Sequence, residues 1–128
     1  MAIVLHSFWE LAQLPLYDLS NDPDRARIVA YLLHCVLGDV LIATVLFVLT
    51  SMVLRSLDWP LANPWRGGSL VISLGLAYTA FSEWYNVYET KAWSYAPPMP
   101  LIGGIGLTPM LQWIVVPALM IMTIRRMR

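Results

Sequence analysis

The chain has 128 residues, of which 59% are hydrophobic and only 12% are charged. Soluble domains carry about 25% charged residues, so this composition excludes an ordinary soluble domain and predicts an integral membrane protein whose first partner is the lipid bilayer. The net charge is zero, with no basic stripe, which excludes a nucleic-acid partner. We expect a single transmembrane domain over residues 1–128, an all-α four-helix transmembrane bundle with a short first helix.

The first helix is predicted over residues 2–17. Spanning a bilayer takes about 17 to 25 residues, so this helix would need nearly its whole length to cross or would enter as a re-entrant segment. Its polar side chains are ordered: His6, Glu10, Gln13 and Tyr17 are separated by four, three and four residues. That spacing places them on one face of a helix.

The second helix is predicted over residues 28–54, after a polar loop in which Asp22 or Asp24 is a plausible N-cap. It is the clearest spanning segment. It carries His34 and Asp39, which are five residues apart and therefore roughly 140° apart around the helix axis. These two side chains cannot share one narrow face.

The third helix is predicted over residues 69–90 and carries Glu83 and Asn86 near its end. A carboxylate inside a membrane helix is costly, so Glu83 should face the protein interior and have a partner. The preceding loop contains Trp59 and Trp65, which suit the membrane interface. The fourth helix is predicted over residues 107–124 and carries Gln112.

Lysine and arginine set the predicted orientation. Five positive residues fall on one side of a four-span bundle, and the other side has three that are diluted by acidic residues. The positive-inside rule therefore predicts a multi-pass protein with both termini in the cytoplasm. The five residues on the cytoplasmic side are Arg55, Arg66, Arg125, Arg126 and Arg128.

The buried polar residues of the four predicted helices cluster at one depth. Counted inward from the outer membrane edge at 1.5 Å per residue, they lie within one or two helical turns of each other. Polar residues scattered at random would not gather in the outer half of the bundle. The members of this group are His6, Glu10, His34, Asp39, Glu83, Asn86 and Gln112.

We predict that this group binds a metal ion or a small ligand. Imidazole and carboxylate side chains suit a divalent transition metal. The residue types assign His6, Glu10, His34 and Glu83 as metal ligands, and Tyr17, Asp39, Asn86 and Gln112 as contacts of a small ligand.

Three alternatives stay open. The site could perform acid–base chemistry on a lipid or isoprenoid-like substrate, with Glu10 or Glu83 as the catalytic acid, because burial shifts carboxyl and imidazole pKa values toward neutrality. The chain could be an accessory subunit of a larger membrane protein complex. His6 and Glu10 could also be a hydrogen-bonded structural pair, with Asn86 and Gln112 as packing contacts between helices.

Several stretches carry a resemblance to known families. They are HSFWELAQLPLY (6–17), LLHCVLGDVLIA (32–43), AYTAFSEWYNVY (77–88), WSYAPPMPLIGGIGLTP (93–109) and QWIVVP (112–117). Together they resemble an uncharacterised family of small bacterial four-helix membrane proteins, which implies a location in the bacterial inner membrane. A weaker likeness is to the emopamil-binding sterol isomerases, whose cavity carries His-x-x-x-Glu on one helix and acids on others. His6, Glu10, Asp39 and Glu83 match that pattern, which implies the acid–base alternative.

Overall fold

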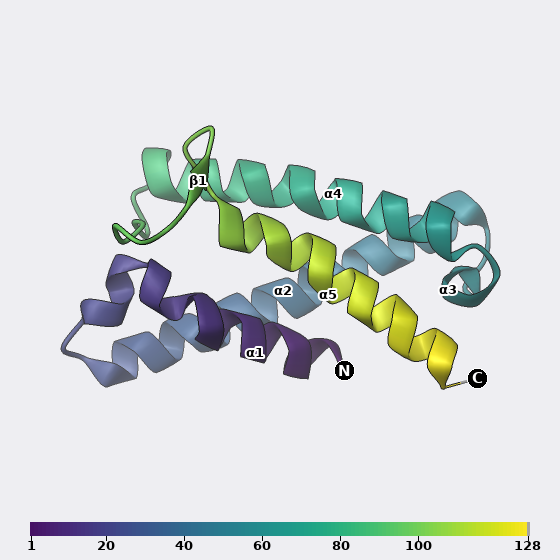
Figure 1. Cartoon of the computed structure of the whole chain (residues 1–128), viewed down its shortest axis with the longest axis horizontal. Coiled ribbons are helices and arrows are strands. Elements are labelled where there is room, and N and C mark those ends of the chain that lie inside the picture. The colour runs from purple at the N-terminus through teal and green to yellow at the C-terminus, as the bar shows by residue number, and fades with distance from the viewer. Residues whose placement is uncertain (128) are drawn as a thin grey trace.

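Helices run along the long axis of the molecule in the computed structural model, which describes residues 1–127 (Figure 1). The prediction of an all-α chain is confirmed, although the described residues contain five α-helices where four were predicted. Three short helical turns and one small hairpin connect them. The α-helices are α1 (Ala2–Gln13), α2 (Arg25–Leu54), α3 (Trp59–Ala62), α4 (Pro64–Trp84) and α5 (Leu107–Arg126).

The first two helices differ from their predicted bounds for local reasons. The α-helix of α1 ends at Gln13, because Pro15 converts the next residues into a 3₁₀ turn, Leu14–Leu16. A second 3₁₀ turn, Asp18–Asn21, follows. Helix α2 begins at Arg25, and the predicted cap at Asp24 is confirmed by a 3.0 Å hydrogen bond from the Ala26 amide.

The segment before α4 was predicted as a loop, and this prediction was wrong in part. Pro64 lies in the first turn of α4, where a missing amide proton costs nothing. The short α3 turns Trp59 inward, so that it is 3% exposed and not interfacial. Trp65, in contrast, is 86% exposed. Helix α4 ends at Trp84 and continues as one π-helical turn, Tyr85–Glu89.

Two segments outside the α-helices close one end of the bundle, and we call them the cover: residues 14–21 and residues 90–98. They pair through an antiparallel bridge between Tyr17 and Tyr95. The Asp18 amide donates to the Ser94 carbonyl at 3.1 Å, and the Ser94 hydroxyl donates to the Asp18 carboxylate at 2.7 Å. The hairpin of β1 (Leu101–Ile102) and β2 (Ile105–Gly106) follows and turns at Gly103 and Gly104, both with positive φ.

An apolar core holds the other end, which we call the α3 end. It consists of Leu46, Trp59, Val71 and Trp113. The Trp113 ring packs against Gly75 of α4. Only a residue without a side chain leaves room for the indole ring at this position. The two ends of the bundle are therefore built differently, with a dry core at one and a cover at the other.

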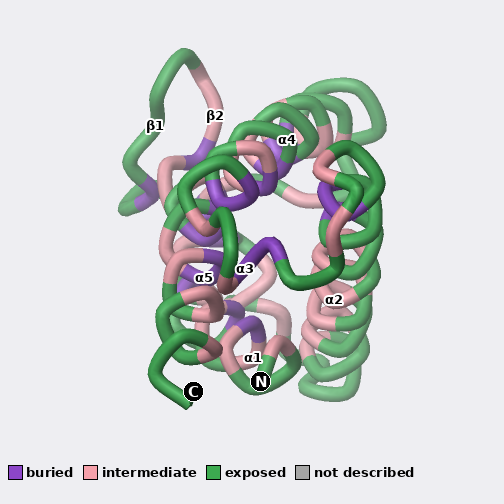
Figure 2. Tube along the Cα trace, turned by 90° about the vertical axis from the view of Figure 1, so that its right-hand side faces the viewer, coloured by how far each residue is buried: buried purple, intermediate pink, exposed green. Residues whose placement is uncertain are grey.

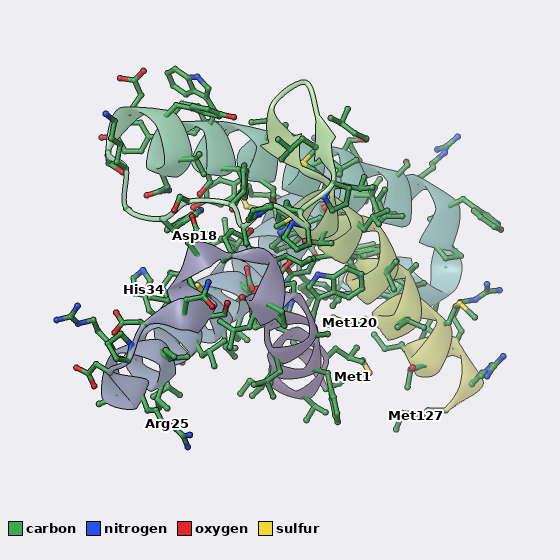
Figure 3. All side chains as sticks on the ribbon, turned by 60° about the vertical axis from the view of Figure 1, so that its left-hand side comes forward. Met1, Asp18, Arg25, His34, Met120 and Met127 are labelled. Carbon is green, nitrogen blue, oxygen red and sulfur yellow. The ribbon has the colours of Figure 1, made fainter. Side chains whose placement is uncertain are left out.

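The surface between the ends is largely apolar. Only three residues of the 30 in α2 are buried, and Leu37 and Leu41 on its outer face are each 65% exposed. Figure 2 shows that most of α2 is exposed or intermediate, whereas buried stretches of α4 and α5 turn toward the middle. Arg25 and Met127 lie near opposite ends of the molecule (Figure 3).

Among residues 1–127, two helices, α2 and α5, are long and apolar enough to cross a membrane by length and composition. Four such helices were predicted. Helix α4 has 21 residues, but glycines, Thr79 and Glu83 make up most of its buried face, and α1 has only 12 residues. At 1.5 Å per residue α1 is about 18 Å long, well short of a hydrocarbon core of about 30 Å.

Candidate functional site

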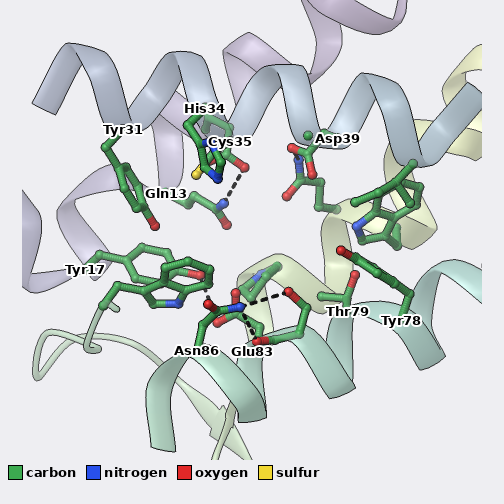
Figure 4. Close-up of a pocket in the computed structure, with 18 residues that line it drawn as sticks. Gln13, Tyr17, Tyr31, His34, Cys35, Asp39, Tyr78, Thr79, Glu83 and Asn86 are labelled. Atoms are coloured by element: carbon green, nitrogen blue, oxygen red, sulfur yellow. Dashed lines mark hydrogen bonds between the residues drawn. The ribbon is translucent and has the colours of Figure 1, made fainter. Parts of the chain in front are cut away.

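A cavity of about 210 Å³ lies among α1, α2, α4 and α5, in the half of the bundle next to the cover (Figure 4). Its wall is mostly polar and aromatic. The structure brings every predicted site residue except His6 to this wall, from four different helices and the cover. These residues are Glu10, Tyr17, His34, Asp39, Glu83, Asn86 and Gln112.

Glu83 is held by the cover. The residue is 7% exposed, and its carboxylate accepts hydrogen bonds at Oε2 from the Tyr95 hydroxyl at 2.7 Å and from the Tyr17 hydroxyl at 3.3 Å. The predicted need for a partner is thus met by two tyrosines. Because both donors reach the same oxygen, Oε1 accepts no side-chain hydrogen bond from residues 1–127.

Gln112 connects three helices at the floor of the cavity. Its amide nitrogen donates to Asp39 Oδ2 at 2.7 Å and lies 2.9 Å from His6 Nδ1. Since the amide donates, His6 accepts at Nδ1, and we assign its proton to Nε2 on that basis. His6 is 1% exposed, and its Nε2 has no partner among the described residues. The ring lies on the α3 side of this floor and lines a second, mainly apolar cavity of about 60 Å³.

Glu10 is oriented by its own helix. The Gln13 amide donates to Glu10 Oε1 at 2.9 Å. The indole nitrogen of Trp9 in turn donates to Gln13 Oε1 at 3.2 Å and to the Thr108 carbonyl at 3.1 Å. This chain of bonds joins α1 to the start of α5 and fixes the Glu10 carboxylate at the cavity wall. The alternative in which His6 and Glu10 bond to each other is therefore not what the structure has. Glu10 bonds to Gln13, and His6 bonds to Gln112.

The four predicted metal ligands do not form one ligand set. Within residues 1–127 no group of three or more His, Cys, Asp or Glu side chains is placed to hold a metal ion. His6 is turned toward Gln112 and Asp39 below the cavity. His34 lines the wall beside Cys35, nearer the start of α2 than Asp39 (Figure 4).

Other wall residues were not among the predicted site residues. Gln13 belongs to the polar stripe of the first helix. Tyr31, Cys35 and Gly38 follow each other at steps of four and three on α2 and share the face that lines the cavity. That spacing was visible in the sequence. Trp93 gave no local signal, because it reaches the wall only through the folding of the cover.

A second depression of about 580 Å³ lies on the outside of the cover. Tyr31 and Trp93 line both this depression and the inner cavity. Their rings meet edge to face with centroids 6.0 Å apart. The pair therefore lies between the outer depression and the inner cavity.

The Tyr95 phenol donates the shorter hydrogen bond to Glu83, and it must keep its proton to do so. Burial raises the pKa of the Tyr95 phenol above its ordinary value of about 10, and the hydrogen bond to Glu83 raises it further. A raised phenol pKa means that the bond stabilises the fold fully below about pH 10 and is lost as the pH rises through the folded-state pKa. The cover is thus tied to Glu83 throughout the neutral range.

We therefore expect wild-type protein to lose thermal stability between about pH 8 and about pH 11, and the Tyr95→Phe variant to lose less over the same interval. The comparison needs unfolding midpoints in detergent at both pH values. Tyr85→Phe is the control, because Tyr85 is exposed and its hydroxyl makes no side-chain bond within residues 1–127. Equal losses in all three proteins would contradict the assignment.

Comparison of the chain with protein-family models, with curated proteins and with solved structures finds no match. The geometry of the cavity is therefore the basis for any functional assignment.

Proposed function

We propose that this chain is a small polytopic membrane protein that binds a small polar ligand in the cavity between α1, α2, α4 and α5. The observation that carries this proposal is a cavity whose wall is built from ionisable and hydroxyl-bearing side chains of four helices. Cavities in which polar groups converge between the helices of a bundle are a common place for small-molecule sites.

The distribution of polar and apolar residues supports a membrane location. Buried positions include His6, Glu10, Thr50, Glu83 and Gln112, whereas large apolar side chains cover the outside of the helices. Soluble proteins rarely expose apolar patches larger than a few hundred Å². A chain that turns its polar groups inward and its apolar groups outward suits a lipid surround, and α2 and α5 have the length and composition to cross it.

Polar groups without partners support a ligand in the cavity. Thr79 is 6% exposed, faces the cavity and makes no hydrogen bond with other side chains of residues 1–127 (Figure 4). The indole nitrogen of Trp93 is buried and unpartnered in the same part of the chain, although Glu83 lies nearby. Buried polar groups normally form hydrogen bonds. The Thr79 hydroxyl and the Trp93 indole nitrogen are therefore free to bond to a ligand.

Cys35, the single cysteine of the chain, reports on access to this cavity because it lies in the wall. We expect methyl methanethiosulfonate, a small neutral reagent, to modify Cys35 in folded protein. The cysteine sulfur attacks the sulfenyl sulfur, a disulfide forms, and methanesulfinate leaves. Mass spectrometry follows the rate through the added methylthio group.

A filled cavity should block this reaction. A side chain at Gly38 meets nothing within 4 Å of its Cβ position and lies in the cavity wall. We expect Gly38→Phe to slow modification by about tenfold or more, because a filled interior excludes the reagent. Leu37→Phe, one position along α2 and 65% exposed, is the matched control and should react like wild type. If wild-type Cys35 is not modified, or if Gly38→Phe reacts at the wild-type rate, the proposed ligand cavity is wrong.

A further inference from the structure

The charge of the cavity wall restricts the ligand. Three carboxylates, those of Glu10, Asp39 and Glu83, line the cavity, and neither lysine nor arginine does. An anion would meet these carboxylates without a compensating positive side chain, and desolvated like charges repel strongly. The wall therefore favours a cation and disfavours an anion.

Each of the three carboxylates has one oxygen fixed by the protein and one left over. Gln13 donates to Glu10 Oε1, Gln112 donates to Asp39 Oδ2, and the two tyrosines donate to Glu83 Oε2. The other three oxygens accept no side-chain hydrogen bond from residues 1–127, and none belongs to the fully buried atoms without a partner. The three carboxylates are thus fixed in orientation at the cavity wall, with Asp39 and Gln112 close to Glu10 and with Trp93 close to Glu83.

The hydroxyl of Thr79 is an independent sign of a missing donor or acceptor. It is nearly fully buried, projects from α4 into the same space and has no partner among the side chains of residues 1–127 (Figure 4). A helical threonine usually bonds back to a carbonyl one turn earlier, as Thr44 and Thr123 do here at 2.7 and 2.8 Å. Thr79 makes no such bond, which leaves its oxygen available to a ligand.

Aromatic rings supply the remaining wall. Electron-rich faces of tyrosine and tryptophan attract cations within about 6 Å, most strongly when water is excluded. They also accept an apolar stem. The aromatic residues of the wall are Tyr17, Tyr31, Tyr78, Trp93 and Trp113.

We propose that the ligand of this cavity is a small primary alkylammonium ion, attracted by the carboxylates of Glu10, Asp39 and Glu83 and packed against the aromatic wall. An ammonium group offers three donors and no acceptor, and it needs only one carboxylate at a time, so it suits a wall that is rich in acceptors. A metal ion of similar charge would need ligands grouped around one point, and the described residues do not provide such a group. This inference rests on the proposed ligand cavity and names the class of its ligand.

Protection of Cys35 tests the ligand class. Butylammonium, butanol and butyrate have similar length and differ in charge, so each is added while methyl methanethiosulfonate modifies the folded protein. We expect butylammonium to slow the reaction in a saturable way and the other two to leave it unchanged. Glu83→Gln and Asp39→Asn should each raise the half-protecting concentration of butylammonium by about 10- to 100-fold, the range for one charge-assisted hydrogen bond.

Glu89→Gln is the matched control, because Glu89 is exposed and outside the cavity wall. Butylammonium should protect Cys35 in this variant at the same concentrations as in wild type. Saturable protection by butanol or butyrate at the same concentrations would overturn the ammonium assignment while the ligand cavity stands. Absence of protection by all three compounds, with Cys35 still reactive and Gly38→Phe still blocking, would also overturn it. Failure of the reagent to reach wild-type Cys35 would instead sink the ligand cavity itself.

Discussion

Replacing Gly75 with alanine is expected to lower the free energy of unfolding by about 1–3 kcal/mol, the usual cost of overpacking a core. A Cβ atom at this position would lie 2.6 Å from Trp113 Cε3 and 3.0 Å from Cδ2. The ring cannot easily move away, because Trp113 is 2% exposed and packs with Leu46 and Val71 in the apolar core. The Trp113 ring also lies against the His6 ring, with centroids 5.6 Å apart.

Thermal unfolding in detergent measures this effect, and Gly38→Ala is the control. The same change on α2 meets nothing within 4 Å. Alanine also favours helix over glycine by about 1 kcal/mol, so this variant should match or exceed wild-type stability. A Gly75→Ala protein as stable as Gly38→Ala would mean that α4 and α5 do not pack through Trp113 as described.

Replacing Gln112 with alanine is expected to cost about 2–5 kcal/mol, the range for leaving buried charged or polar partners unsatisfied. One amide nitrogen serves both Asp39 and His6, and Gln112 itself is 2% exposed. Its loss leaves a carboxylate and an imidazole facing each other with only a 3.4 Å contact between them. Three helices lose their shared contact at the floor of the cavity.

Asn86→Ala is the control for the loss of an amide in general. The Asn86 amide donates only within α4, to the Ser82 carbonyl at 2.8 Å and to the Ser82 hydroxyl at 3.3 Å, and Asn86 is half-buried. Its removal should cost no more than about 1 kcal/mol. Equal unfolding midpoints for the two variants would contradict a special role for Gln112 between the helices.

Much of the helical layout could be predicted, because apolar runs and helical spacing are local properties of a sequence. The second and fourth predicted helices match α2 and α5 closely, and Asp24 is one of the two residues predicted as the cap of the second helix. The misses have a different origin. Nothing near Trp59 indicates that α3 would turn it into the core, since that burial depends on Gly67 of the next helix leaving room for the ring.

The candidate site was predictable to the extent that helical stripes carry it. Glu10 and Tyr17 line the cavity because they share one face of the first helical segment, and Glu83 because a buried carboxylate must face inward. The hydrogen-bond partners of these side chains could not be predicted. Spacing along single helices does not reveal that Gln112 would stand between His6 and Asp39, nor that Tyr95, in a loop, would supply the donor to Glu83.

The unequal construction of the two ends has a consequence for motion. The cover is tied down by a few hydrogen bonds between residues 14–21 and 90–98, and by its tyrosines on Glu83. The helices are joined chiefly by the apolar core at the α3 end. Segments with few apolar contacts open locally at a much lower free energy than a packed core. The cover is therefore a separate opening unit, and solvent can exchange with the cavity while the helices keep their mutual packing at the far end.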